Sequence, residues 1–174
     1  MWVFGYGSLL WNPGFEYADS QLATLAGYHR SFCMRSIHHR GTPEAPGLVL
    51  ALDARQDAQC HGMALLVSEA TQNQTLSYLR DRELISSAYV EKILTVSLAD
   101  GSNVPAVTYV VDPDHVQYCG ALSMEEQALI ISQAVGGRGE NSEYLHKTAR
   151  QLANMGISDA DLTWLSTRVA GLTG

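Results

Sequence analysis

The sequence is poor in cysteine and in charge. Only three cysteines occur among 174 residues, Cys33, Cys60 and Cys119, and no two of them form a CxxC pair. This odd, scattered set indicates neither a disulfide framework nor a zinc knuckle and favours a reducing compartment. Charged residues make up 17% and hydrophobic residues 46%, which is typical of a folded globule and not of a disordered chain.

Basic residues and long apolar runs are also scarce. Lys and Arg number 11 against 18 Asp and Glu, so the net charge is −7 at pH 7, the wrong sign for binding a phosphate backbone. We therefore expect no nucleic-acid partner. No Lys or Arg precedes Arg30, and glycines interrupt the apolar start 1–11, which is unlike a signal peptide. No run approaches the ~18 apolar residues that a membrane span needs, so we expect a cytoplasmic protein without membrane contact.

The length and the order of elements indicate the fold class. A chain of 174 residues is sufficient for one domain with a sizeable core, and we expect a single domain over 1–174. Strands are expected at 2–6, within 24–37, and at 48–52, 61–67, 90–98 and 104–111; helices at 68–82, 124–135, 142–154 and 159–169. A strand-rich first two-thirds followed by a helical last third predicts an α+β fold, with helices covering a mostly antiparallel or mixed sheet.

Several local signals place turns and helix ends. The polar segment 53–59 predicts a turn between two strands, and Asp-Gly at 100–101 predicts a hairpin. Ser123 and Glu126 have the spacing of a capping box, which favours a helix start there. Gly171 is expected to end the last helix.

Two short segments are candidates for chemistry. The first is the glycine turn Gly5-Tyr6-Gly7-Ser8, which follows a strand but has neither the GxGxxG nor the Walker pattern, so a nucleotide site has little support. Ser8 could be a nucleophile, although its spacing favours a helix-capping role. The second segment, 78–83, ends in a carboxylate near two arginines, although a charged helix end is usually a solvated one. The six histidines lack metal-ligand spacing, and we expect no metal or cofactor.

Four segments taken together resemble one family. They are WVFGYGSLLW at 2–11, HRGTPE at 39–44, YLRDRE at 78–83 and NSEYL at 141–145, and they occur in the order found in the ChaC-like γ-glutamylcyclotransferases. The similarity runs from the first residues to Asp159. It implies a γ-glutamylcyclotransferase-like α+β domain with a small β-barrel-like sheet and flanking helices. It also implies an enzyme that converts glutathione to 5-oxoproline and cysteinylglycine without a cofactor.

The resemblance implies roles for particular residues. Glu83 corresponds to the acid/base of the family, and Tyr144 to a substrate contact, although a half-buried packing role for Tyr144 stays open. The segment that binds the γ-glutamyl group comprises Val3, Phe4, Gly5, Tyr6, Gly7, Ser8 and Leu9. Arg82 is expected to be structural. Arg35 and Arg40 could each pair with a substrate carboxylate, because arginine binds carboxylates in a bidentate manner.

The expected reaction needs no enzyme nucleophile. The α-amino group of the substrate attacks its own γ-carbonyl, so the protein supplies a base, and partial burial is expected to raise the pKa of Glu83 toward neutrality. Backbone N–H groups of the glycine turn are expected to stabilise the oxyanion. Two alternatives stay open at this point: a cyclotransferase for other γ-glutamyl amides or amino acids, and a non-catalytic regulatory module linked to cation transport.

Overall fold

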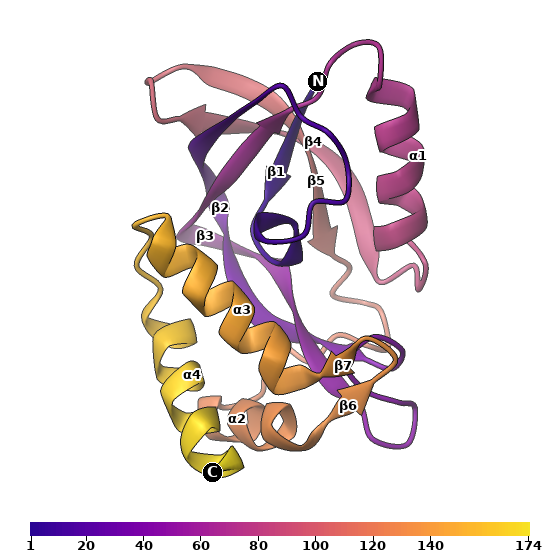
Figure 1. Ribbon diagram of the computed structural model, residues 1–174, viewed down its shortest axis with the longest axis vertical. Helices are drawn as coiled ribbons and strands as arrows, with labels where there is room; N and C mark the ends of the chain where they lie inside the picture. Colours follow the sequence, from indigo (N-terminus) through magenta and orange to yellow (C-terminus); the bar gives the residue numbers. More distant parts are fainter. The chain divides into compact units, whose positions relative to one another are not determined.

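The computed structural model describes residues 1–174 (Figure 1). Its elements, in chain order, are β1 (Trp2–Gly5), the 3₁₀ turn η1 (Ser8–Leu10), β2 (Asp19–Ser36), β3 (Gly47–Leu66), α1 (Gln72–Glu83), β4 (Tyr89–Leu98), β5 (Asn103–Val111), α2 (Met124–Gln133), β6 (Val135–Gly136), β7 (Gly139–Glu140), α3 (Asn141–Asn154) and α4 (Ala160–Thr173). The predicted α+β class with a helical last third is confirmed.

The chain divides into two compact units. Unit 1 comprises Met1–Arg30 and Ala51–Val116, and unit 2 comprises Ser31–Leu50 and Gln117–Gly174. The long strands β2 and β3 contribute residues to both units. The expectation of a single domain over 1–174 therefore stays a prediction.

Five strands close into a barrel in the order β1-β3-β2-β4-β5. Strand β1 pairs antiparallel with β3 and parallel with β5, which makes the sheet mixed. Strands β4 and β5 form the predicted hairpin, in a register that runs from Tyr89 opposite Val111 to Ser97 opposite Asn103. Closure leaves these strands without a free edge, and it brings β1 and its following turn beside β5.

The predicted turn at 53–59 is wrong, because these residues lie inside the continuous strand β3. The segment contains no glycine or proline, and most of its residues are exposed. A solvent-facing stretch of strand needs polar side chains, and that composition imitates a turn. Strand β2 is likewise continuous through Gly27, whose φ of +83° is a left-handed conformation typical of a bulge.

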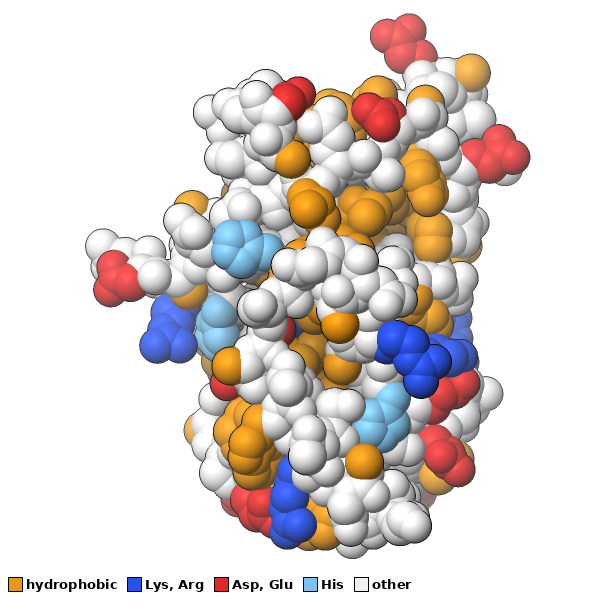
Figure 2. Space-filling view, turned by 60° about the vertical axis from the view of Figure 1, so that its left-hand side comes forward, with side chains coloured by type: hydrophobic (Ala, Val, Ile, Leu, Met, Phe, Trp, Pro, Cys, Tyr) orange, Lys and Arg blue, Asp and Glu red, His pale blue; other side chains and the backbone are white.

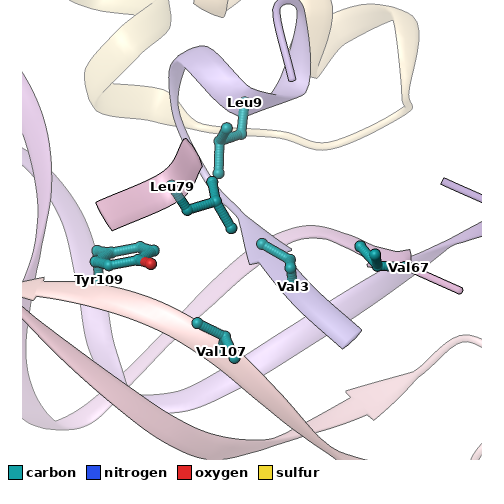
Figure 3. Close-up of a cluster of buried hydrophobic side chains, with 6 residues drawn as sticks. All are labelled: Val3, Leu9, Val67, Leu79, Val107 and Tyr109. Atoms are coloured by element: carbon teal, nitrogen blue, oxygen red, sulfur yellow. The ribbon is translucent and has the colours of Figure 1, made fainter. Parts of the chain in front are cut away.

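A hydrophobic cluster in unit 1 joins the elements that carry the candidate residues. It contains Val3 of β1, Leu9 of η1, Leu79 of α1, Val107 and Tyr109 of β5, together with Val67. Figure 3 shows these side chains converging from their separate elements. Complete burial of Val3 and Leu79 contributes roughly 1.5–3 kcal/mol per side chain, so the cluster fixes α1 against β1 and β5.

In unit 2, α2, α3 and α4 pack against one another (Figure 1). The capping box at the start of α2 is confirmed: the Glu126 backbone N–H donates to Ser123 Oγ, and the Ser123 backbone N–H donates to the Glu126 carboxylate. The predicted end of this helix at residue 135 is wrong, because Val135 already belongs to the short hairpin β6-β7. The predicted stop at Gly171 is also wrong, since α4 continues to Thr173.

Charged side chains of both signs are visible on the face drawn in Figure 2. On the face in Figure 2, basic side chains (blue) are separated by acidic, histidine and uncharged groups. Some large hydrophobic side chains stay exposed, among them Ile93 and Val116. None of the helices combines the length and apolar composition that a bilayer crossing requires.

Candidate active site

The glycine turn follows directly on a buried strand. Val3 and Phe4 are fully buried in β1, and the chain then turns through Gly7 into η1, where the Leu10 backbone N–H donates to the Gly7 carbonyl across 3.0 Å. In a 3₁₀ turn the N–H groups before this first bond have no partner within the turn. The backbone N–H groups of Ser8 and Leu9 therefore have no partner within the turn and can donate to acceptors outside it.

Close approach of the β1 backbone explains the glycine at position 62 of β3. A Cβ on Gly5 would lie 3.1 Å from the Leu9 Cβ, and one on Gly62 of β3 would lie 2.3 Å from the Gly5 carbonyl oxygen. Real Cβ atoms do not approach a carbonyl oxygen so closely, so the paired strands need glycine at position 62. The turn is therefore held by its contacts, although its sequence alone suggests flexibility.

Arg30 supports the turn from strand β2, a role that no local sequence pattern indicates. Its Nε donates to the Tyr6 carbonyl across 3.0 Å, and its Nη1 donates to the His61 carbonyl across 3.2 Å. The Arg30 side chain is buried, and charge-assisted bonds of this kind are stronger than bonds between neutral groups. The Tyr6 hydroxyl donates to the Tyr109 carbonyl across 3.0 Å. Tyr6 is thus fixed at both its backbone and its side chain.

Glu83 is the last residue of α1. Its side chain is 18% exposed, and Oε1 lies 3.3 Å from Arg82 Nε. The helix ends there because Leu84 is the C-cap, its backbone N–H donating to the Arg80 carbonyl. The carboxylate is therefore a partly buried group at a fixed helix end and differs from the solvated end that composition alone allowed.

Arg82 brings the glycine turn and Glu83 together. Its Nη2 donates to Ser8 Oγ across 2.8 Å, and its Nη1 donates to the carbonyls of Asn12 and Pro13 across 2.7 and 3.0 Å. Only 7% of this side chain is exposed. The contacts support the structural role expected for Arg82. The predicted capping role of Ser8 is wrong, because Gly7 is the N-cap of η1 and no side-chain bond caps the turn.

A second charged network joins α1 to β4 and β5. Arg80 forms a bidentate pair with Glu91 of β4, with N–O distances of 2.9 and 2.8 Å, and the Tyr109 hydroxyl donates to Glu91 Oε2 across 2.9 Å. The bond from Arg80 lowers the pKa of Glu91. Burial, together with the charges of Glu91 and Glu83, raises the pKa of Tyr109. At neutral pH the network therefore pairs an ionised carboxylate with a guanidinium and a neutral phenol.

The two remaining predicted site residues belong to unit 2. Arg35 lies on β2, where its backbone N–H donates to the Gln117 carbonyl across 2.8 Å and its carbonyl accepts from the Gln117 side chain. Tyr144 of α3 is buried, accepts from the Leu50 backbone N–H across 3.3 Å and packs edge-on against Phe32. Their substrate contacts stay predictions.

Helix α3 begins one residue earlier than the sequence predicts, and the Asn141 side chain forms hydrogen bonds outside the helix. The sequence pattern predicts a helix over 142–154, but α3 already includes Asn141, and Glu140 is its N-cap. The Asn141 side chain instead accepts from the Leu48 backbone N–H and donates to the Leu48 carbonyl, both across 2.7 Å. This amide completes the hydrogen bonding of a buried residue in β3.

Comparisons with known proteins agree with this arrangement. A family model described as "ChaC-like protein" matches residues 1–171. A relative named glutathione-specific gamma-glutamylcyclotransferase from Escherichia coli (strain K12) is 37% identical over 172 residues, which cover 99% of this chain and 74% of the relative. The relative named glutathione-specific gamma-glutamylcyclotransferase 1 from Danio rerio is 36% identical over 152 residues, covering 86% and 77%.

Solved structures give the same result for the fold. The crystal structure of a γ-glutamyl cyclotransferase specific to glutathione from yeast is similar with a TM-score of 0.89 and 26% identity, covering 98% of this chain and 96% of the yeast chain. The implied γ-glutamylcyclotransferase-like fold is therefore confirmed. Because the family model spans nearly the whole sequence, this chain belongs to the ChaC-like protein family.

Proposed function

We propose that this protein is a glutathione-specific γ-glutamylcyclotransferase in which Glu83 is the acid/base. The observation that carries the proposal is the set of Arg82 contacts, which hold the glycine turn and a partly buried carboxylate side by side. The relatives described above, whose names state this activity, support the substrate class. The reaction converts glutathione to 5-oxoproline and cysteinylglycine and consumes no water.

The proposed role of Glu83 follows from the proton balance. The uncharged α-amino nitrogen of the substrate attacks the γ-carbonyl carbon, and a new C–N bond closes the five-membered ring. Glu83 accepts a proton from that nitrogen and delivers it to the cysteine nitrogen as the old C–N bond breaks. Partial burial raises a carboxyl pKa and a nearby guanidinium lowers it, so the expected rise at Glu83 depends on burial exceeding the effect of Arg82.

The proposed role of the glycine turn is to bind charge and restrict the substrate. The N–H groups of Ser8 and Leu9 are suited to the negative charge that develops on the γ-carbonyl oxygen, and loss of one such donor typically costs about 10²–10³ in turnover. Residues Val3 to Leu9 as a whole are proposed to bind the γ-glutamyl group in a folded conformation. Fixed geometry of this kind favours intramolecular attack.

Two further roles complete the proposal. We retain Arg35 as a partner for a substrate carboxylate and Tyr144 as a substrate contact, both testable by Arg35→Gln and Tyr144→Phe variants with an increased KM as the expected result. A cytoplasmic location is proposed because Cys33, Cys60 and Cys119 form no disulfide, which suits a reducing compartment.

The decisive experiment measures 5-oxoproline by mass spectrometry. Purified protein is incubated with glutathione and, separately, with γ-glutamyl-alanine, and Glu83→Gln is assayed in parallel. We expect release from glutathione that Glu83→Gln abolishes while its unfolding midpoint stays near that of the wild type. Turnover of γ-glutamyl-alanine alone would favour the other substrate class. No product from either would favour the non-catalytic module.

A further inference from the structure

Glu91 of β4 contacts two elements that adjoin Glu83. Arg80 donates to both of its carboxylate oxygens, and the Tyr109 hydroxyl donates to Oε2. Arg80 lies on the same last turn of α1 as Glu83, three residues earlier, a spacing that places two side chains on neighbouring positions of a helix. The network is therefore connected to the helix turn that carries the proposed acid/base.

Packing ties the phenol end of the network to the same turn. Tyr109 is buried in the cluster that contains Leu79, the residue before Arg80 (Figure 3). The charge of Glu83 is among the causes that raise the pKa of Tyr109, so the carboxylate and the phenol are within electrostatic range. Glu91 of β4 thus contacts this turn of α1 through Arg80, and Tyr109 of β5 packs with it through Leu79.

We propose that Glu91 and Arg80 are positioning residues that set the charge balance at Glu83, with Tyr109 holding Glu91 in place; the inference rests on the proposed function of Glu83. Glu91 supplies a negative charge that disfavours ionisation of Glu83, and Arg80 neutralises it. Because the two charges compensate each other, neither an unpaired cation nor an unpaired anion acts on the proposed base.

The Arg80–Glu91 pair is expected to contribute little to the stability of the fold. The Arg80 side chain is 53% exposed and that of Glu91 is 23% exposed. Exposed ion pairs typically contribute only about 0.2–1 kcal/mol. Their charges nevertheless act on a third group nearby, because a charge needs no direct contact to affect ionisation.

Removing one partner of the pair should shift the Glu83 pKa in a direction that depends on which partner is removed. The titratable groups linked to this turn of α1 include Arg82, Arg80 and Tyr78 of α1, Glu91 of β4 and Tyr109 of β5, and Arg82 donates toward η1 only to uncharged atoms. Glu91→Gln leaves the Arg80 cation unbalanced, which favours ionised Glu83. Arg80→Gln leaves the Glu91 anion unbalanced, which favours protonated Glu83.

Direct titration of the carboxyl group tests the inference. Protein labelled with ¹³C at the glutamate δ carbon is titrated by NMR, and the Glu83 resonance is assigned by its absence in Glu83→Gln. We expect Glu91→Gln to lower the Glu83 pKa, and Arg80→Gln to raise it, by about 0.5–1 unit each. The double variant should return toward the wild-type value. The acidic limb of the pH profile of kcat/KM for glutathione should move in the same directions.

A matched pair in unit 2 supplies the control. Arg168 Nε donates to Glu125 Oε2 across 3.0 Å and Arg168 Nη2 donates to Glu125 Oε1 across 2.5 Å, so this pair has the same fork geometry on an exposed surface. Glu125→Gln should leave the Glu83 titration and the pH profile unchanged. If it shifts them as much as Glu91→Gln does, the effect comes from net charge alone and the inference is wrong.

The remaining outcomes separate this inference from the proposed function. Unmoved Glu83 titrations in Glu91→Gln and Arg80→Gln, or shifts of one sign in both, would refute the inference even if glutathione is turned over. Absence of glutathione turnover in the wild type would refute the proposed function, while the NMR titration would still decide whether the pair controls Glu83. If Glu91→Gln does not fold, the Arg80→Gln variant tests the inference alone: a raised Glu83 pKa supports it, and an unchanged or lowered pKa refutes it.

Discussion

Arg82 Nη2 donates to Ser8 Oγ across 2.8 Å although 74 positions separate the two residues in the sequence. The same guanidinium contacts Glu83 through Nε and the carbonyls of Asn12 and Pro13 through Nη1. One buried cation therefore fixes the turn after β1, the loop beyond it and the end of α1. The planar fork of arginine can reach several acceptors in one plane, which a lysine ammonium cannot do.

The first prediction concerns this fork. Arg82→Lys keeps the charge but loses most of the hydrogen bonds, so we expect a loss of stability of about 1.5–3 kcal/mol. We also expect at least a tenfold drop in kcat/KM for glutathione, on the order of 1.4 kcal/mol, because the turn is no longer fixed beside Glu83. Urea unfolding and the 5-oxoproline assay measure the two effects. The exposed Arg55→Lys serves as control, and equal behaviour of the two variants would contradict the prediction.

The second prediction concerns the close approach of β1 and β3. A Cβ at position 62 would lie 2.3 Å from the Gly5 carbonyl oxygen, so Gly62→Ala must displace the end of β1. We expect a destabilisation of about 1–3 kcal/mol and reduced turnover, since the displaced strand leads directly into the glycine turn. Circular-dichroism melting and the glutathione assay provide the measurements.

A glycine in α4 provides the matched control for this substitution. A Cβ on Gly171 meets nothing within 4 Å, and the residue is helical. Gly171→Ala should therefore stabilise the protein by about 0.5–1 kcal/mol with turnover unchanged. A stabilising Gly62→Ala would mean that the backbone of β1 moves away at little cost.

The sequence predicts those parts of the molecule whose signals are local. The capping box of Ser123 and Glu126 and the hairpin turn at 100–101 depend on residues a few positions apart, and both are confirmed. The last residue of α1 is also close to its predicted boundary, because charges and the end of the apolar pattern mark it. The glycine turn and Glu83 are identified as candidates from family motifs, which are matched as whole segments.

Features set by distant contacts could not be predicted. The helix α2 stops before Val135 because the following hairpin pairs its backbone with the loop after β2: the Gly137 N–H donates to the His38 carbonyl across 2.8 Å. A Cβ on Gly136 would lie 2.4 Å from the Gly41 backbone nitrogen. No local signal in residues 124–135 reveals that partner.

The supporting residues of the candidate site were missed for a similar reason. Arg30 and Glu91 lie within β-prone runs, where a charged side chain usually faces solvent. Only barrel closure places Arg30 against the Tyr6 carbonyl and brings Glu91 to Tyr109. A buried arginine in a strand is informative once burial is known, but the sequence does not give burial.

The third prediction concerns the amide that completes β3 in unit 2. Asn141 is fully buried, and its side chain satisfies both the N–H and the carbonyl of Leu48. Asn141→Ala leaves these groups without that partner, and each buried polar group that loses its hydrogen bond costs about 1–3 kcal/mol. We expect a clearly lower urea midpoint, whereas the exposed Asn154→Ala should change it little. Similar midpoints for the two variants would show that the Leu48 backbone finds other partners.

The final prediction concerns acid sensitivity in unit 2. Hydrogen bonds from Lys147 and Arg40 lower the pKa of Glu143 to about 2 from 4.5. A depressed carboxyl pKa stabilises the folded state above the unfolded-state value, and this contribution is lost as the pH falls from 4.5 toward 2. Because 42% of the Glu143 side chain is exposed, we expect less than about 1 kcal/mol in total.

Glu143→Gln reveals this contribution by removing it. The variant should be less stable than the wild type at pH 7 and should approach the wild type as the pH falls to about 2, since protonated Glu143 no longer pairs with Arg40. Urea unfolding at pH 7, 4 and 2.5 measures the difference, and the NMR titration of labelled glutamates reports the carboxyl directly. A stability difference that is constant with pH would show that Glu143 contributes through packing and not through its charge.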